Sequence, residues 1–428
     1  MFNKIRFHLF RYSYTLLYAL CLPIYATILI RKYKDTKPII PFRQHFNLGV
    51  LPTKEAKIWI HCASFGEAQG ISQLIKKLIQ EKQKIIITTL TASGAAVLEK
   101  KFKSNVMIRY LPFDLPFLIQ NFHKTHKIKL LLLMEKELWP NLITHTKKKK
   151  IPILLMNARL DERSLKRYNM IKSFSTTLLK KCQHIACVSQ KDKNNFKILN
   201  IEDKKLSICE NLKLDIQLKK EQIQQSQILK TNIDSRLILS AVSTHKGEES
   251  IIIDLWKNLI KKHPNLLLIL IPRHPHRVES IQKLCKTFIT SLHSQQKKPS
   301  SKDQIYIVDT LGEAISFINI SDLILMGGSW VPIGGHNFLE AALLEKCILV
   351  GPYMSHFQEI FENFLENNAI IQETQPVQLY KQCHELLKSP KKRQNYGQKA
   401  KNIAMNKQGS TEKHWHQIKK LLTYEKSI

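Results

Sequence analysis

The chain has 428 residues, 43% hydrophobic and 8% aromatic, which makes it too long for one compact core and too apolar for a disordered or fibrous protein. Its 67 Lys and Arg residues outnumber its 34 Asp and Glu residues, for a formal net charge of +33. This surplus suits an anionic partner, either nucleic acid or an acidic membrane surface, although a coding bias toward Lys, Ile and Asn would also raise the charge. The cysteines show no CxxC pair and no zinc-finger spacing, which indicates a reducing, cytoplasmic compartment.

An uncharged apolar run occupies residues 15–30, with basic residues on both sides. Sixteen helical residues span about 24 Å, less than the ~30 Å hydrocarbon core of a bilayer. The basic residues that follow the run argue against signal-peptide cleavage. We therefore predict an uncleaved membrane anchor over residues 1–34, either tilted through a thin bilayer or lying in its interface; a buried first helix of the soluble domain is the alternative. The heavier basic cluster after the run favours a cytoplasmic body.

From residue 57 onward, short apolar runs alternate with helical stretches. The predicted strands are residues 58–62, 85–90, 106–110, 130–134, 153–156 and 185–188, then 237–241, 266–271, 305–308, 323–326 and 347–350. Runs that are apolar throughout predict parallel sheets covered by helices on both faces. A polar break at residues 217–232 separates the two sets.

This pattern predicts an α/β protein with two doubly wound, Rossmann-like domains that follow the anchor. The first domain covers residues 35–218 and the second covers residues 219–428, whose last helices are free to pack back on the first. Ligands of such sheets bind at the carboxyl ends of the strands. The chain has no Gly-x-Gly-x-x-Gly and no Gly-x-x-x-x-Gly-Lys-Ser/Thr phosphate loop.

Charged residues follow three of the predicted strands in the first domain. Glu67, in the motif HCASFGE, falls where the next helix should begin. It could accept a proton from a hydroxyl nucleophile, or it could simply interact with the positive end of that helix. Glu135, Lys136 and Glu137 form either a surface ion-pair turn or a cleft wall, and the stretch NARL from Asn157 ends the following strand in a similar way.

The second domain carries two candidate nucleotide-binding segments. Arg273, between two prolines at a strand end, offers a planar guanidinium suited to phosphate or carboxylate. Four glycines between residues 327 and 335 lie between a strand and a helix, where backbone N–H groups and the helix N-terminus would favour a phosphate. Glu340, one turn into that helix, would reach ribose hydroxyls.

Taken together, these motifs resemble those of the 3-deoxy-D-manno-octulosonic acid (Kdo) transferases, which act on lipid A. The similar stretches run in order from HCASFGE, TTLTASG, YLPFD, MEKELWPNL and NARLDERS to STHKGEES, LLLILIPRHP, DTLGE and GGSWVPIGGHNFLEAA. They cover residues 58 to about 360. The resemblance implies a glycosyltransferase B-type fold, with the lipid A precursor bound by the first domain and the donor CMP-Kdo by the second.

The resemblance also implies roles for individual residues. Glu67 matches the general base, and Glu135 and Lys213 match residues that stabilise the transition state. The CMP-Kdo site is implied to comprise Pro272, Arg273, Leu311, Gly312, Glu313, Asn337, Phe338, Leu339 and Glu340. The expected reaction is inverting and needs no cofactor. We also expect it to be independent of metal, because no Asp-x-Asp motif follows a strand.

Four positions depart from the family pattern. Glu210 replaces a glycine, which would be costly if the turn there needs a positive φ. Leu311 replaces a methionine, Ile333 stands where an arginine is frequent, and Phe338 replaces a common proline. None of them removes a group to which we assign chemistry, so we expect an active enzyme; the number of Kdo residues it adds is left open.

Two other functions compete with this one. A nucleotide-sugar epimerase shares the two-domain architecture but is a soluble protein, so the apolar N-terminal run counts against it. A basic nucleic-acid-binding protein would need basic and aromatic residues clustered on one face, whereas the lysines here are spread along the chain. We instead expect an enzyme at the cytoplasmic side of the inner membrane of a Gram-negative bacterium. Arg31, Lys32, Lys34 and Arg43 would then attract the anionic surface, and the remaining lysines would reflect composition.

Overall fold

The computed structural model describes residues 2–36, 42–48, 57–102, 105–216, 218, 220–230, 233, 236–296 and 298–424. The chain forms two compact units. The first unit comprises Met1–Asp215 together with Gly409–Ile428, and the second comprises Ile216–Gln408. The end of the chain thus belongs to the first unit.

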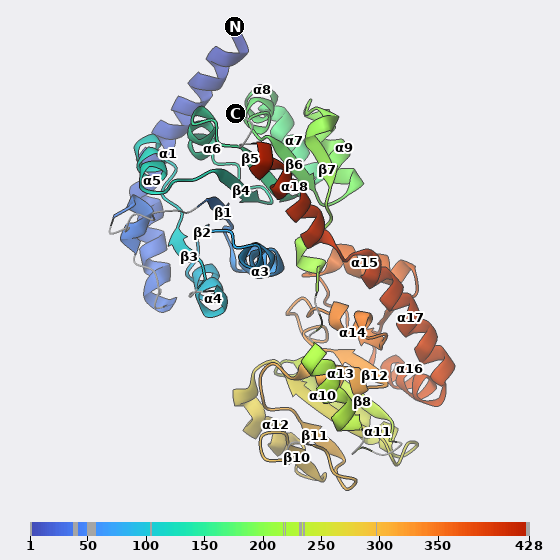
Figure 1. The fold of residues 1–428 in the computed structure, drawn as a ribbon. Helices are drawn as coiled ribbons and strands as arrows, with labels where there is room; N and C mark the ends of the chain where they lie inside the picture. Colours follow the sequence, from blue (N-terminus) through green and yellow to red (C-terminus); the bar gives the residue numbers. More distant parts are fainter. Residues whose placement is uncertain are drawn as a thin grey trace. The chain divides into compact units, whose positions relative to one another are not determined.

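A parallel sheet of seven strands, in the order β3-β2-β1-β4-β5-β6-β7, forms the centre of the first unit (Figure 1). Its strands are β1 Ile58–His61, β2 Ile85–Thr89, β3 Met107–Tyr110, β4 Leu130–Met134, β5 Ile153–Ala158, β6 His184–Cys187 and β7 Leu206–Ile208. Nearly all central-strand residues are buried, because helices cover both faces of the sheet. The strand order reverses between β1 and β4, so the loops after these two strands diverge and leave room for a ligand.

Helices of the first unit pack on both faces of this sheet. They are α1 Phe2–Thr36, α2 Phe65–Gly70, α3 Ser72–Gln80, α4 Ala92–Phe102, α5 Pro116–Thr125, α6 Pro140–Lys148, α7 Glu162–Met170, α8 Lys172–Leu179, α9 Gln190–Ile198 and α18 Ser410–Tyr424, with 3₁₀ helices η1 Phe42–Phe46, η2 Asp203–Lys205 and η3 Leu212–Leu214. The last helix, α18, packs against α3 and β6 (Figure 1). Its Trp415 and Ile418 join the same core cluster as the strands.

Helix α1 packs along its length against the first unit through one stripe of side chains. Phe7 stacks on Phe174 with ring centroids 5.2 Å apart, and Arg11 donates a 3.1 Å hydrogen bond to Asn141. Two turns before the end of the helix, Leu29 is buried beside Phe113. The stretch Ile5–Arg31 is long and apolar enough to cross a membrane by length and composition, yet its outward face remains exposed on the protein.

A second parallel sheet of seven strands, in the order β10-β11-β9-β8-β12-β13-β14, forms the centre of the second unit. Its strands are β8 Ile238–Thr244, β9 Leu267–Pro272, β10 Thr290–Leu292, β11 Ile305–Ile307, β12 Leu323–Met326, β13 Cys347–Val350 and β14 Ile371–Gln372. Its helices are α10 Lys220–Lys230, α11 Glu248–Ile260, α12 Val278–Leu284, α13 Ala314–Ile320, α14 Leu339–Leu343, α15 Gln358–Glu366, α16 Pro376–Lys388 and α17 Pro390–Asn406, with the 3₁₀ helix η4 Pro275–Arg277. The switch in strand order here lies between β8 and β12.

These two sheets confirm the predicted fold class, and all eleven predicted strands are present within a few residues. Strands β7, β10 and β14 were not predicted; they have three residues or fewer and lie at sheet edges. Such short strands leave no apolar run in the sequence, and their neighbours in the sheet define them. Most of the polar break forms the helix α10.

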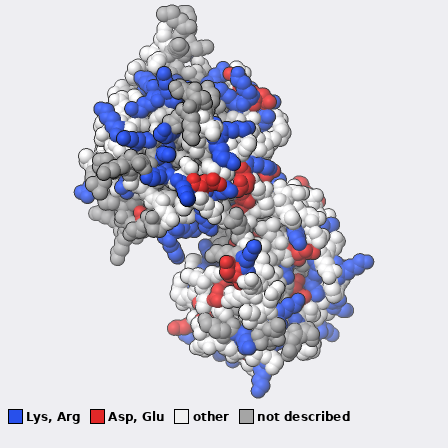
Figure 2. Space-filling model, in the orientation of Figure 1, with Lys and Arg blue, Asp and Glu red and all other residues white. Residues whose placement is uncertain are grey.

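Charge is unevenly divided between the units. The first unit has 43 Lys and Arg residues against 17 Asp and Glu, whereas the second has 24 against 17. Blue side chains accordingly cover much of the visible face of the first unit (Figure 2). The net charges are therefore +26 and +7, so most of the surplus belongs to the unit that carries the apolar helix α1.

Candidate active site

Glu67 lies at the carboxyl end of β1, beside the switch point of the first sheet. It is the third residue of α2, and Ser64 caps that helix: the Ser64 hydroxyl accepts a 3.3 Å hydrogen bond from the Glu67 N–H. In return, the Glu67 carboxylate accepts hydrogen bonds from the Ala63 N–H at 2.7 Å and from the Ser64 hydroxyl at 3.1 Å. This reciprocal capping fixes the orientation of the carboxylate. Both alternatives for Glu67 are thus compatible, because a capping carboxylate is also a positioned base.

The electrostatic surroundings of Glu67 make its carboxylate more basic. Burial raises the pKa of Glu67; the Ala63 N–H opposes this, while the negative charges of Glu137 and Glu135 add to it. A carboxylate with a raised pKa accepts a proton more readily near neutral pH. The site therefore has the physical property that a general base needs.

Glu135 and Lys213 form an ion pair near this carboxylate. Glu135 directly follows β4, and its Oε1 atom is 2.6 Å from the Nζ atom of Lys213. Lys213 lies in η3 and packs its stem against α2, where a Cβ atom at Gly70 would come within 2.5 Å of the Lys213 Cγ. A larger residue at position 70 would therefore displace the lysine. Three sequence segments that are far apart thus meet at one edge of the sheet.

The three charged residues after β4 divide into two groups. Lys136 is exposed and pairs with Asp161 and with the Ser164 hydroxyl, which makes it part of a surface ion-pair turn. Glu137 instead points inward and lies 3.4 Å from the Nε2 atom of His61. Although burial alone would raise the pKa of Glu137, its contacts with His61 and Trp139 lower it overall.

His61 and Glu137 were not among the predicted site residues. His61 is the last residue of β1 and is fully buried, with its Nδ1 atom 3.1 Å from the Thr88 carbonyl oxygen. The only signal in the sequence was a histidine at the end of an apolar strand, which is equally typical of a core residue. The pairing with Glu137 depends on the alignment of β1 with β4.

In the second unit, a buried glutamate occupies the switch point. Glu248, the first residue of α11, accepts four backbone hydrogen bonds of 2.8 to 3.0 Å from the N–H groups of His245, Gly328, Ser329 and Trp330. These groups are therefore not available to a phosphate, contrary to our expectation for the first half of the glycine-rich segment. Glu248 acts as an internal anion that holds the loop after β12 against the loop after β8.

Arg273 and Glu340 carry side chains without a hydrogen bond or ion pair to the residues that the structure describes. Arg273 is exposed directly after β9, where its N–H bonds the Thr244 carbonyl oxygen at 3.0 Å. Burial raises the pKa of Glu340, and the charge of Arg273 opposes that rise, so the two residues are near one another. A cation and a carboxyl group that are not engaged by the protein itself are suited to a polar ligand.

Three histidines lie close to Arg273. The Nε2 atoms of His245 and His336 are 2.7 Å apart, and the ring of His274 lies 5.5 Å from that of His245. Burial, together with the neighbouring His245 and Arg273, lowers the pKa of His336 to about 4, and burial also lowers the pKa of His245. The His245–His336 contact therefore joins two neutral rings at neutral pH. One ring must then donate its proton to the other.

The loop after β11 holds the next three predicted donor-site residues. Leu311 is 74% exposed, and Gly312 has φ of 92°, a left-handed conformation that favours glycine. The carboxylate of Glu313 bonds Thr310, accepts a 3.2 Å hydrogen bond from Gln225 of α10 and lies 3.1 Å from His293 Nε2. These contacts anchor the loop, while the Leu311 side chain and the open face of Gly312 are left to solvent.

The segment 337–339 leads into α14, and two of its side chains point into the core. Phe338 is fully buried and its ring lies 5.0 Å from that of Phe364; Leu339 is also buried. The Asn337 side chain accepts a 3.1 Å hydrogen bond from the Leu339 N–H. Phe338 and Leu339 can therefore contact a ligand through their main chains alone.

Two of the departures from the family pattern gain a physical explanation. Glu210 has φ of 64°, so the turn does require the left-handed conformation that a glycine would adopt more easily. Its carboxylate pairs with Lys413 of α18 at 2.8 Å, which compensates part of that cost. Ile333 is 40% exposed, so the side chain that takes the place of an arginine faces solvent.

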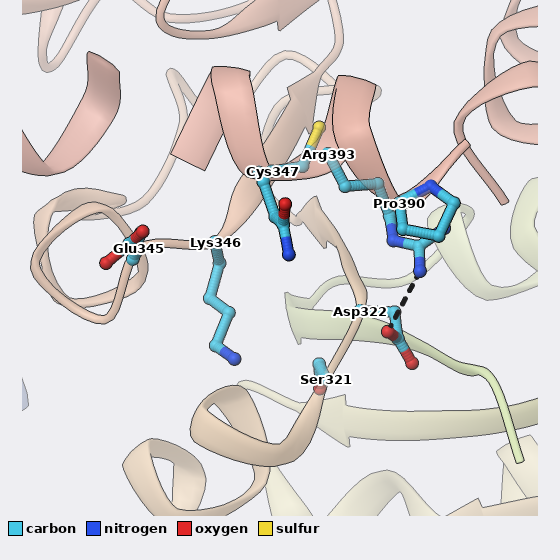
Figure 3. Close-up of a pocket in the computed structure, with 8 residues that line it drawn as sticks. Ser321, Asp322, Glu345, Lys346, Cys347, Pro390 and Arg393 are labelled. Carbon is cyan, nitrogen blue, oxygen red and sulfur yellow. Dashed lines mark hydrogen bonds and ion pairs between the residues drawn. The ribbon is translucent and has the colours of Figure 1, made fainter. Parts of the chain in front are cut away.

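A small pocket of the second unit lies away from these residues. It has a volume of about 160 Å³ and is lined by Ser321, Asp322, Glu345, Lys346, Cys347, Pro390, Arg393 and Gln394, with Arg393 and Asp322 joined by a 3.3 Å ion pair (Figure 3). Several of these residues precede β12 and β13, so the pocket opens at the amino ends of the strands. The candidate residues lie at the opposite edge. Among the described parts of the chain, no three His, Cys, Asp or Glu side chains are grouped so that they could hold a metal ion.

Comparison with known proteins places this architecture in a class. A crystal structure of a glycosyltransferase from Rickettsia africae is 16% identical, covers 86% of this chain and 99% of its own, and gives a TM-score of 0.52. A UDP-GlcNAc 2-epimerase from Neisseria meningitidis, bound to UDP-GlcNAc, is 15% identical over 86% of this chain and 100% of its own, with a TM-score of 0.56. At these identities the likeness shows the fold, which is that of two-domain glycosyltransferases and related sugar-nucleotide enzymes.

The sequence comparisons are more specific. Residues 41–216 match a family model described as 3-deoxy-D-manno-octulosonic-acid transferase (kdotransferase). The 3-deoxy-D-manno-octulosonic acid transferase of Haemophilus influenzae is 32% identical over 414 residues, which cover 95% of this chain and 97% of that protein. The chain therefore belongs to the Kdo transferase family and is a glycosyltransferase. This result decides against the epimerase and the nucleic-acid-binding protein as its class.

Proposed function

We propose that this enzyme transfers Kdo from CMP-Kdo to a lipid A precursor in lipopolysaccharide synthesis, with inversion at the anomeric carbon. The proposal rests on the surroundings of Glu67: its carboxylate is buried, has a raised pKa and lies at the switch point of the first sheet. Glu67 takes the proton of the acceptor hydroxyl, whose oxygen forms a bond to the anomeric carbon of Kdo. The bond from that carbon to the phosphate oxygen breaks, and CMP leaves with the electron pair.

The roles of the other residues follow from their surroundings. In the second unit, Arg273 would neutralise the phosphate charge, and Glu340 would bind ribose hydroxyls, because neither side chain is engaged by the described residues. The main chain of Leu311, Gly312 and Glu313 and the start of α14 would contact the rest of CMP. In the first unit, Glu135 and Lys213 would stabilise charge that develops during transfer.

We further propose that α1 lies in the plane of the cytoplasmic leaflet of the inner membrane. Its contacts with Phe174, Asn141 and Phe113 hold one stripe of the helix against the protein, so it could not cross a bilayer without carrying the first unit with it. The opposite stripe exposes apolar residues that suit the boundary between lipid headgroups and acyl chains. They include Leu16, Leu17, Leu20 and Ile24, each more than 60% exposed. Arg31 and Arg43 are exposed nearby in sequence, while the side chains of Lys32 and Lys34 lie outside the described residues.

Mass spectrometry of the lipid formed from CMP-Kdo and a lipid A precursor tests the reaction and counts the Kdo residues added. Unchanged lipid would contradict the proposed acceptor. The same assay with excess chelator tests metal independence, which would be wrong if activity disappeared and Mg²⁺ restored it.

Vesicle flotation tests the membrane proposal. We expect the protein to bind vesicles that contain phosphatidylglycerol more tightly than neutral vesicles, and less tightly as salt increases. The double variant Leu17→Glu, Leu20→Glu should lose this binding, whereas Met170→Glu, at an exposed position of α7, should retain it. Equal binding of both variants would contradict the placement of α1.

A further inference from the structure

Asn157 connects both members of the Glu135–Lys213 pair. It is the penultimate residue of β5, which pairs with β4, the strand directly before Glu135, and it is fully buried. Its Oδ1 atom accepts a 2.9 Å hydrogen bond from the N–H of Leu212, the residue before Lys213. Its Nδ2 atom donates a longer hydrogen bond, of 3.5 Å, to Glu135 Oε1, the same oxygen that contacts Lys213.

The orientation of this amide is determined by its partners. A backbone N–H can only donate, so the Asn157 atom that faces Leu212 must be the oxygen, and the nitrogen must face Glu135. The Asn157 side chain therefore bonds the loop that contains Lys213 (the lysine loop) through its oxygen and the Glu135 carboxylate through its nitrogen. Asn157 and Glu135 also share a left-handed backbone, with φ of 50° and 52°. Such conformations are costly and concentrate at functional sites.

The C-terminal helix α18 holds the backbone of Asn157 through His414. The N–H of Asn157 donates a 3.1 Å hydrogen bond to His414 Nε2, while His414 Nδ1 donates to the Ser410 carbonyl oxygen at 2.8 Å. This pattern requires the neutral tautomer with its proton on Nδ1. Burial lowers the pKa of His414 to about 4, which keeps that ring neutral in the physiological range.

The start of α18 also holds the two ends of the loop that contains Lys213. The Ser410 hydroxyl donates to the Glu210 carbonyl oxygen at 3.1 Å. On the other side, the Asp215 carboxylate accepts hydrogen bonds from the N–H groups of Gly409, at 3.1 Å, and Thr411, at 2.6 Å. The lysine loop is thus fixed at its two ends by α18 and in its middle by Asn157.

We propose that Asn157, supported by His414, is a positioning residue that sets the geometry of the Glu135–Lys213 pair. The proposal rests on the proposed roles of these two residues in the transfer. It also gives a function to the return of the chain to the first unit, because the last helix, α18, holds the residues that position Glu135 and Lys213.

The variant Asn157→Asp separates positioning from folding. An aspartate keeps an oxygen for the Leu212 N–H but replaces the donor to Glu135 with a second negative charge. We expect kcat to fall at least tenfold while the KM for CMP-Kdo changes less than twofold. The acid limb of the pH–rate profile should also move to higher pH, because a second negative charge near the carboxylates of the site disfavours their ionised form.

Two further variants test the support from α18 and separate it from a general loss of stability. His414→Ala removes the acceptor for the Asn157 N–H and should lower kcat in the folded protein as well. His123→Gln alters another buried histidine of the first unit, one that bonds Thr146 outside the site, and should lower the melting temperature without lowering kcat. Each rate is divided by the folded fraction measured by circular dichroism.

The outcomes also distinguish this inference from the proposed function. If Glu135→Ala is inactive but Asn157→Asp retains the wild-type kcat and pH profile, Asn157 is not a positioning residue and the proposed function stands. If Glu135→Ala is itself fully active, the assigned role of the pair is wrong. A loss of activity in His123→Gln equal to that in Asn157→Asp would mean that the effect is structural.

Discussion

Each unit has a parallel sheet of seven strands with one switch in strand order, but the two sheets differ in strand order and in the kind of site at the switch point. At the switch point of the first sheet, carboxylates and a lysine from separate loops lie close together, and burial together with the charges of Glu137 and Glu135 raises the pKa of Glu67. At the switch point of the second, Glu248 accepts four backbone hydrogen bonds, while the side chains of Arg273 and Glu340 have no hydrogen bond or ion pair to the described residues. The sheet therefore determines where a site forms, and the loops determine its chemistry.

The units also differ in charge and in buried histidines. The first has a net charge of +26 and the apolar helix α1, and the second a net charge of +7. The first also holds most of the buried histidines whose pKa is strongly lowered. We interpret the first unit as the reacting and membrane-facing part and the second as the nucleotide-binding part, and the following predictions test that division.

The largest expected effect is that of Glu67→Gln. Glutamine keeps an acceptor for the Ala63 N–H, so α2 should still form, but it cannot take a proton. We expect kcat to fall roughly 10²- to 10⁴-fold with CMP binding by the second unit unchanged in calorimetry. Ser64→Ala is the matched control, since it removes the helix cap and leaves the carboxylate; its loss should stay below tenfold. Near wild-type turnover of Glu67→Gln would contradict the assignment of Glu67 as the general base.

The second prediction concerns Glu248→Gln, which should damage the second unit alone. The glutamine amide would direct N–H groups at two of the four backbone N–H groups, which have no other acceptor among the described residues. We expect the second unit to lose about 3 kcal/mol of stability and CMP to bind at least tenfold more weakly.

Hydrogen exchange resolved by peptide measures the two units separately in this variant. Glu279→Gln, at an exposed position of α12, is the control. Faster exchange in the first unit than in the second would contradict the role of Glu248.

The third prediction is that acid unfolds the first unit before the second. Burial lowers the pKa of six of its histidines from 6.5 to about 4, namely His45, His123, His126, His145, His184 and His414, and in the second unit His336 alone reaches that value among the described residues. Since the unfolded chain binds these protons first, stability falls as pH drops from 6.5 toward 4. Asp114, whose pKa burial raises to about 6, and Glu67, whose pKa burial also raises, act in the opposite direction but are outnumbered by the six histidines. Hydrogen exchange between pH 7 and pH 4.5 would show the order, and earlier opening of the second unit would refute it.

The smallest expected effect is that of Glu210→Gly. Glycine removes the cost of the left-handed conformation, about 1–2 kcal/mol, but increases the entropy of the unfolded chain and loses the pair with Lys413. We expect a net gain of about 0.5 kcal/mol in urea unfolding. Glu202→Gly, at a residue with φ of −64°, should instead lose stability. A clear loss in Glu210→Gly would show that the ion pair outweighs the strain.

Much of the fold could be predicted from the sequence, because buried parallel strands appear in it as continuous apolar runs. The positions of Glu67, Glu135 and Arg273 could be predicted for the same reason, since each follows such a run directly or within a few residues. Strands β7, β10 and β14 could not, because two or three residues carry no periodicity. The engagement of Gly328 by Glu248 was also missed, because a glutamate at the start of a helix has the same appearance whether it is exposed or buried.

The sequence by itself determined the fold class, the family and the charge surplus of +33, because these depend on composition and on local order along the chain. Only the tertiary structure decided that most of this charge lies with α1 in one unit, that Glu210 occupies a left-handed turn, and that His414 of the last helix reaches Asn157 across 257 positions. Contacts between distant segments depend on strand order and on the return of the chain, and neither leaves a local signal. The residues that could be predicted are therefore those with a proposed chemical role, and the residues that hold them in place emerged from the folded structure.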